Sequence, residues 1–293
     1  MKIVRSPEEL GPARRAVAIG TFDGVHLGHR RVLEAARTAG ATSTVITFDP
    51  HPRTALGNRV ELLTTRERRL ELLADVGLDE ALVLEFDLDF ARTTPPEFVD
   101  RYLRGIGAEV VVAGAGFRFG HRRAGDLALL ESLGFGVRTV PIVEGVSSSA
   151  IRALVKAGDV DRAAAMLGRP VEIEGVVVSG DARGGTLGFP TANLQVAHDL
   201  LVPAYGIYAG ATLETHAAIS IGVNPHYGGV EQRVEAFLLD YEGDLYGQRL
   251  VVELWRRLRD ERSFESEAEL VAQIARDVEE TRTAQRPLNA AKP

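Results

Sequence analysis

The chain of 293 residues is 45% hydrophobic, which is enough apolar material for two domains with separate cores. It carries 41 acidic against 34 basic residues, a formal net charge of −7, which disfavours non-specific nucleic-acid binding. The absence of cysteine excludes disulfides, thiolate metal sites and a cysteine nucleophile. No segment approaches the roughly 18 consecutive apolar residues of a membrane span, so we expect a cytoplasmic protein without nucleic-acid or membrane partners.

Residues 1 to about 143 alternate between apolar, β-branched runs and stretches of helical periodicity. The runs predict strands at 16–22, 43–48, 81–86, 109–114 and 137–143. The periodic stretches predict helices near 28–39, 66–76, 95–105 and 126–133. Such alternation is typical of a parallel sheet with helices on both faces.

The pattern changes after a predicted helical bridge at 147–170, in which serines are candidate N-caps and Gly158 is a stop signal. Short runs with turn signals then predict strands at 171–180, 206–213, 216–223, 234–241 and 249–258. These strands favour a small barrel or sandwich, closed by one helix within 263–280. We therefore expect a first domain over 1–168 and a second over 169–293.

The first candidate site follows the predicted strand at 16–22, where the chain reads TFDGVHLGH. Glycines there let the backbone approach a phosphate, and the helix N-terminus adds free N–H donors. His26 and His29 lie three residues apart on the first turn, so both can face one triphosphate and stabilise charge at a phosphorus under attack. A glycine-rich turn with two surface histidines, or a zinc site, is the alternative interpretation.

The second candidate site is the glycine-rich stretch GVVVSGDARGGTLGFPTANL at 175–194. A loop of this kind can surround phosphates with its N–H groups. It is not a Walker A loop, because no GK[ST] follows the glycines. A long hairpin turn is the alternative interpretation of the loop taken alone.

The string FDGVHLGH resembles the HxGH nucleotidyltransferases, in the form found in bacterial bifunctional riboflavin kinase/FAD synthetases. The stretches AGAGFRFGHRRAGD at 113–126 and SSSAIR at 147–152 are similar to further motifs of that family. The resemblance implies a Rossmann-like α/β domain in which the FMN phosphate attacks the α-phosphorus of ATP and pyrophosphate leaves. It makes His26 and His29 catalytic, and it implies ATP contacts at Gly20, Phe22, Asp23, Gly24, Gly28, Ser147, Ser148 and Arg152.

Two phenylalanines of the FRFG stretch, Phe117 and Phe119, are the candidates for the flavin pocket of this domain. Alternating phenylalanines are also typical of a strand that packs in a core. The family usually has asparagine or aspartate at the position of Gly116, so a polar side chain is missing here.

The string LGFPTANL resembles the signature of riboflavin kinases, and four later stretches at 203–210, 221–225, 234–247 and 258–266 agree in order. The resemblance implies a six-stranded barrel with a C-terminal helix that transfers the γ-phosphoryl of ATP to the 5′-hydroxyl of riboflavin. Thr191 and Asn193 are then the Mg²⁺ and phosphate ligands, and Glu235 is the catalytic base on a half-buried strand. Further ATP contacts are expected at Gly180, Arg183, Gly184, Gly188 and Pro190, and flavin contacts at Tyr227 and Arg259.

The leading hypothesis is a bifunctional enzyme, monomeric or weakly homo-oligomeric, that is both an ATP:riboflavin 5′-phosphotransferase and an ATP:FMN adenylyltransferase. It uses Mg²⁺, consumes ATP twice, and gives FMN and FAD. One alternative is an active riboflavin kinase whose first domain is impaired or uses another nucleotide because of Gly116. Another is a flavin- or nucleotide-binding regulator without turnover.

Overall fold

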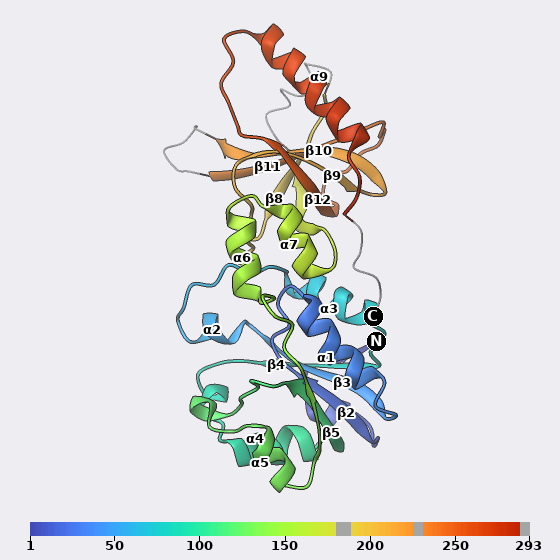
Figure 1. Cartoon of the computed structure of the whole chain (residues 1–293), viewed down its shortest axis with the longest axis vertical. Helices are drawn as coiled ribbons and strands as arrows, with labels where there is room; N and C mark the ends of the chain where they lie inside the picture. The colour runs from blue at the N-terminus through green and yellow to red at the C-terminus, as the bar shows by residue number, and fades with distance from the viewer. Residues whose placement is uncertain (180–188, 225–230, 288–293) are drawn as a thin grey trace. The chain divides into compact units, whose positions relative to one another are not determined.

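The computed structural model describes residues 1–179, 189–224 and 231–287 (Figure 1). Its contacts divide the chain into two compact units, one made of residues 1–60 and 66–146 and the other of residues 61–65 and 147–293. Within the described ranges, no helix combines the length and the apolar character needed to cross a membrane.

The first unit is built on a six-stranded sheet in the order β1-β4-β3-β2-β5-β6, in which every neighbouring pair is parallel. Its strands are β1 (Lys2–Val4), β2 (Arg15–Ile19), β3 (Thr42–Asp49), β4 (Glu80–Glu85), β5 (Ala108–Gly114) and β6 (Gly136–Val140). The predicted parallel sheet is confirmed, and β1 is an edge strand that the sequence pattern did not indicate. The chain adds β3 and β4 on one side of β2 and β5 on the other, so the ends of β2 and β5 meet at a topological switch point, where α/β proteins bind ligands.

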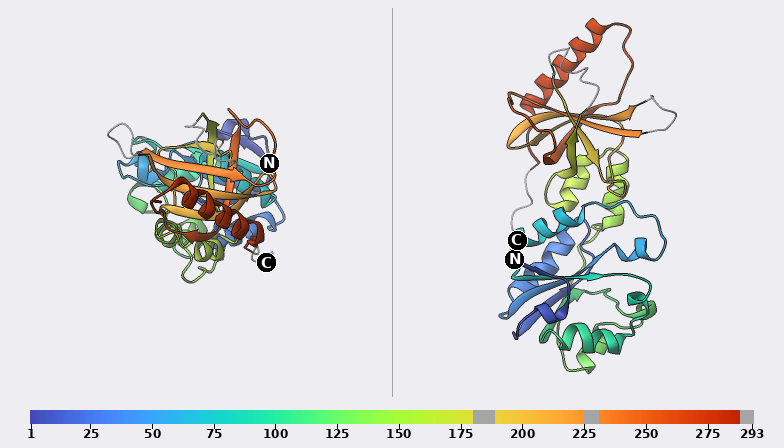
Figure 2. Two further views of the ribbon diagram at one scale, coloured as in Figure 1. Left: turned by 90° about the horizontal axis from the view of Figure 1, so that it is seen from above. Right: turned by 180° about the vertical axis from the view of Figure 1, so that it is seen from behind.

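Helices cover both faces of this sheet, as the alternating pattern predicts (Figure 2). They are α1 (Leu27–Arg37), α3 (Arg66–Asp75), α4 (Pro95–Phe98) and α5 (Leu127–Ser132), with a π-helical stretch η3 (Val99–Arg104) directly after α4. The short helix α2 (Pro52–Ala55) buries no residue. Ala18 and Val45 pack in one core cluster with residues of α1 and α3. Val17 and Ile46 point to the opposite face and pack with residues of α4, η3 and α5.

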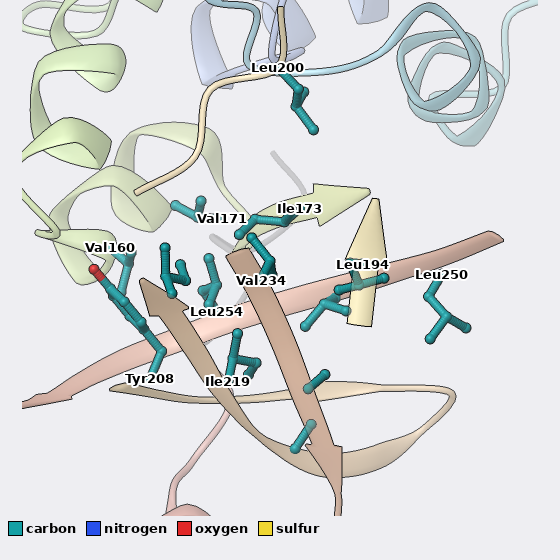
Figure 3. Packing of buried hydrophobic residues seen from close by; sticks show 14 of the residues in the cluster. Val160, Val171, Ile173, Leu194, Leu200, Tyr208, Ile219, Val234, Leu250 and Leu254 are labelled. Atoms are coloured by element: carbon teal, nitrogen blue, oxygen red, sulfur yellow. The ribbon is translucent and has the colours of Figure 1, made fainter. Parts of the chain in front are cut away.

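The second unit is a closed antiparallel barrel of six strands in the order β10-β11-β8-β7-β12-β9. The strands are β7 (Val171–Val178), β8 (Ala192–Val196), β9 (Gly206–Thr212), β10 (Thr215–Asn224), β11 (Glu231–Leu238) and β12 (Arg249–Arg259). Figure 3 shows Ile173, Leu194, Ile219, Val234 and Leu254 converging inside it. The six-stranded barrel implied by the resemblance is confirmed, and β8 is the strand that the alternation pattern missed.

The second unit also contains two helices that precede the barrel and one short segment, 61–65, that comes from the first half of the chain. The helices α6 (Ser148–Lys156) and α7 (Val160–Leu167) contribute to the same core as the barrel. In the segment 61–65, Leu62 forms a parallel bridge with Leu200, and Thr65 Oγ1 donates to Glu174 Oε2 at 2.5 Å. The sequence did not predict this segment, and the boundary between residues 168 and 169 stays a prediction.

The C-terminal helix α9 (Glu267–Thr283) is held on the barrel by a buried ion pair. Arg259, the last residue of β12, donates from Nε and Nη2 to the Asp277 carboxylate, with 2.6 Å between Nη2 and Oδ2. Gln273 Nε2 donates to the same carboxylate at 2.8 Å. Because Asp277 is 4% exposed, its charge depends on these donors.

We predict that Asp277→Asn lowers the free energy of unfolding by roughly 1.5–3 kcal/mol, because the half-buried Arg259 guanidinium loses its charged partner. Urea unfolding followed by circular dichroism measures this change. Asp240→Asn is the matched control, since Asp240 and Arg282 form an exposed pair that contributes little. Equal changes in the two variants would contradict the assigned role of Asp277.

Candidate active sites

The loop between β2 and α1 has a strained backbone. Phe22 and Val25 adopt positive φ angles of 51° and 39°, and Gly24 lies between them at 82°. Positive φ is costly for a bulky or β-branched side chain and clusters at functional sites. Both apolar side chains are buried, at 2% and 0% exposure, so core packing holds the loop in this conformation.

The two histidines predicted to act on ATP form a stacked pair at the start of α1. Their ring centroids lie 3.6 Å apart, and the rings are inclined by 15°. His26 caps the helix, because its Nδ1 accepts from the backbone N–H of His29 at 3.2 Å. That bond leaves the N–H on Nε2, so His26 presents a donor for a phosphate oxygen.

Close packing leaves little room for a side chain at two of the glycines predicted to contact ATP, Gly20 and Gly28. A Cβ at Gly28 would lie 3.2 Å from Cε1 of His26, and a Cβ at Gly20 would lie 3.1 Å from the Phe22 ring. Larger residues at either position would therefore push these rings out of place. The ring of Phe22 also meets His29 edge-on, with 5.3 Å between the centroids.

The ring of His29 is held in its neutral form. Burial, and then the proximity of His26, lower the pKa of His29 well below its ordinary value. Its Nδ1 is buried and has no partner among the described residues.

A buried arginine near the same loop was not selected from the sequence. Arg69 of α3 is 2% exposed, and its Nη2 donates to the carbonyl of Phe48 at 3.0 Å. Burial lowers the pKa of Arg69, whereas the neighbouring Asp23 and Asp49 raise it. Asp23 itself is 1% exposed, which places it beneath the loop rather than on its outer surface. A basic residue on a predicted helix gave no sequence signal for this role.

The candidate flavin residues follow β5, next to β2 at the switch point. Phe119 is 7% exposed, lies in the core and contacts Phe98 at a centroid distance of 5.4 Å. Phe117 is half-buried and stacks on Phe119, with 5.8 Å between the centroids. Gly116 is exposed, and a Cβ built there would have nothing within 4 Å. The structure thus has room for the polar side chain that Gly116 lacks.

The SSSAIR stretch belongs to the second unit and begins α6. Ser147 is the N-cap, and its side chain accepts from the backbone N–H of Ala150 at 3.2 Å. Ser148 is the first residue of the helix. Arg152 Nε donates to the carbonyl of Glu61 at 2.7 Å, so this guanidinium helps to hold the segment 61–65. The predicted helix cap is confirmed, and the ATP contacts of these residues stay predictions.

The candidate kinase residues gather on the outer surface of the barrel, where β8 pairs with β11. Asn193 and Glu235 are direct partners in this antiparallel pair. Glu235 is half-buried, as predicted, and forms an ion pair with Arg233. Arg233 Nε also donates to Asn193 Oδ1 at 3.4 Å. Arg233 was not selected from the sequence, because one arginine on an alternating strand is usually a solvated charge.

The remaining kinase candidates surround this pair of strands or lie outside the described residues. Thr191 is half-buried and Pro190 is exposed just before β8, while Phe189 meets Phe237 edge-on at 5.4 Å. Arg259 is paired with Asp277, as described above. The predicted contacts that fall outside the described residues are Gly180, Arg183, Gly184, Gly188 and Tyr227.

Among residues 1–179, 189–224 and 231–287, no group of three or more His, Asp or Glu side chains is placed to hold a metal ion. The neutral oxygens of Thr191 and Asn193, with the Glu235 carboxylate next to Asn193, are hard donors that suit Mg²⁺ shared with phosphate oxygens. A cation bound there would depend on the nucleotide for its other ligands.

The fold and the two sites define a chain that joins an HxGH-type α/β unit to a closed six-stranded barrel. Residues 10–151 match the family model described as FAD synthetase, and residues 167–285 match the one described as riboflavin kinase. The chain belongs to the family of bifunctional riboflavin kinase/FMN adenylyltransferases, as its similarity to proteins with that name shows.

Three of these relatives span nearly the whole chain. The protein from Listeria monocytogenes is 35% identical over 94% of both chains, and that from Bacillus subtilis is 34% identical over 92% of both. The Escherichia coli K12 protein is 35% identical over 94% of this chain and 96% of its own. A crystal structure described as a macrolide-efflux protein from Streptococcus pneumoniae has a TM-score of 0.87, 31% identity, and coverage of 97% and 99%.

We predict that neutral His29 makes stability depend on pH. The folded-state pKa lies below the ordinary value of 6.5, so the unfolded chain takes up this proton first as the pH falls. The stabilisation is complete above about pH 6.5 and is lost below it. His29→Gln should therefore lose less unfolding free energy than the unmodified chain between about pH 7 and pH 5.5, as urea titrations measure.

His198→Gln is the control for this prediction, because His198 is exposed. It should keep the pH dependence of the unmodified chain. If His29→Gln also kept it, His29 would not be the buried neutral group.

Proposed function

We propose that this chain phosphorylates riboflavin to FMN at the barrel and adenylylates FMN to FAD at the α/β unit, with one ATP consumed at each site. Family membership over both parts of the chain supports this proposal. The single observation that carries it is the presence of both constellations, the stacked His26–His29 pair and the Asn193–Glu235 pair, in their matching domains. We further propose that the chain is a monomer or a weak homo-oligomer.

At the barrel, Glu235 accepts the proton of the riboflavin 5′-hydroxyl while that oxygen bonds to the γ-phosphorus and ADP leaves. The position of Glu235 opposite Asn193 supports this role, because it brings the base beside an oxygen that can hold the nucleotide. Mg²⁺ held by Thr191 and Asn193 would neutralise charge on the transferred phosphoryl group. The proposal keeps Pro190 as a nucleotide contact, and Tyr227 and Arg259 as flavin contacts.

At the α/β unit, the FMN phosphate attacks the α-phosphorus of ATP, and pyrophosphate leaves. No proton has to be removed from the attacking phosphate, so the site needs donors rather than a base. His26 Nε2 and the neutral ring of His29 supply N–H donors where charge develops on the phosphate oxygens. Phe117 presents its half-buried ring to the flavin, with Phe119 behind it in the core.

Paired substitutions test the assignment of one reaction to each unit. Glu235→Gln should lower FMN formation by about 10²–10⁴-fold, because the base is lost, and should leave FAD formation from supplied FMN unchanged. His29→Gln should lower FAD formation by about 10²–10³-fold and leave FMN formation unchanged. Chromatographic separation of the flavins measures both rates. If each variant lost both activities, the two-site proposal would be wrong.

The open space at Gly116 supports a second form of the proposal, in which adenylylation of FMN is slower than it would be with a polar side chain at this position. Gly116→Asn should raise kcat/KM for FMN about fivefold, since one hydrogen bond contributes about 1 kcal/mol. Gly116→Ala fills the same space without a polar group and should give no gain. A similar rate for all three chains would show that Gly116 costs this reaction nothing.

A further inference from the structure

Arg233 lies at the centre of the kinase constellation, although it is not one of the residues selected from the sequence. On β11, Val234 and Ala236 are buried in the barrel core, at 1% and 0% exposure. Because side chains alternate along a strand, Arg233 and Glu235 share the opposite face. Their side chains are 30% and 19% exposed, so the ion pair is partly shielded from water.

The guanidinium of Arg233 contacts both groups on which phosphoryl transfer is proposed to depend. It forms the ion pair with Glu235 Oε1, and its Nε donates to Asn193 Oδ1. A glutamate on a strand has several rotamers, and an asparagine amide can flip its oxygen and nitrogen. A planar fork of donors that is anchored on the amide oxygen selects one arrangement of the carboxylate.

We propose that Arg233 is a positioning residue of the kinase site, which is itself held by the Asn193 amide oxygen and fixes the Glu235 carboxylate. This inference rests on the proposed role of Glu235 as the base. The guanidinium acts through Glu235 and has no separate effect on the reacting atoms. Its loss leaves the substrates bound but the base misplaced, so kcat falls while the KM values for riboflavin and ATP stay constant.

Four variants test this role: R233Q, R233K, E235Q and the double variant R233Q/E235Q. R233Q should lower kcat for FMN formation about 10–100-fold, as expected for a base displaced by about 1 Å. R233K should recover part of this loss, because an ammonium pairs with Glu235 but cannot also reach Asn193 with a planar fork. R256Q is the matched control, since Arg256 lies on β12, which does not pair with β11, and is exposed; it should keep full activity.

The double variant separates positioning from a direct contact. If Arg233 acts through Glu235, R233Q/E235Q has the same kcat as E235Q. Additive losses, or a raised KM for ATP with unchanged kcat, would show that Arg233 contacts the nucleotide and would overturn the inference. Should E235Q be inactive, the comparison of kcat with KM and the rescue by lysine still decide the question.

Unchanged KM values for riboflavin and ATP show that the barrel of R233Q is folded, and FAD formation from supplied FMN shows the same of the α/β unit; R233Q should leave both unchanged. Loss of both activities in R233Q would mean a structural role and would contradict the inference. Full FMN formation by E235Q would instead refute the proposed base, and the inference with it. Full activity of R233Q beside an impaired E235Q would refute the inference alone.

Discussion

The burial of Phe22 and Val25 is the interaction on which the first site depends. Each side chain gains roughly 1.5–3 kcal/mol on transfer to the core, while each unusual φ angle costs about 1–3 kcal/mol. Burial therefore offsets the strain and fixes the loop between β2 and α1. His26 directly follows Val25 in the chain. It caps α1, because its Nδ1 accepts from the backbone N–H of His29. The buried side chains of Phe22 and Val25 thus fix the position of the stacked imidazoles of His26 and His29.

The second site depends on the alternation of side chains along β11. Val234 and Ala236 point into the barrel, so Arg233 and Glu235 point outward. The register of β11 with β8 then puts Glu235 opposite Asn193. A slip of one residue would turn the carboxylate into the core, so barrel packing determines the geometry of this candidate site. Both sites therefore use polar groups held in place by apolar contacts.

Sequence patterns predicted the elements that have strong periodicity, including β2, α1, β11 and α9, and the motifs predicted His26, His29, Asn193 and Glu235. The sequence pattern did not predict the short strand β8, because five residues carry little alternation. Its pairing with β7 and β11 is set by the rest of the barrel. The segment 61–65 depends on contacts with residues about 90 or more positions away, such as Arg152 with Glu61 and Thr65 with Glu174. Arg69 and Arg233 gain their roles from such non-local neighbours, which a linear pattern does not contain.

The most direct test of the account is the time course of flavins formed by the unmodified chain from riboflavin, ATP and Mg²⁺. FMN should appear first and FAD later, because the product of the barrel is the acceptor at the α/β unit. FMN that accumulates without FAD would restrict the account to the kinase. Unchanged riboflavin, with FMN still adenylylated when supplied, would contradict the assignment of the barrel site.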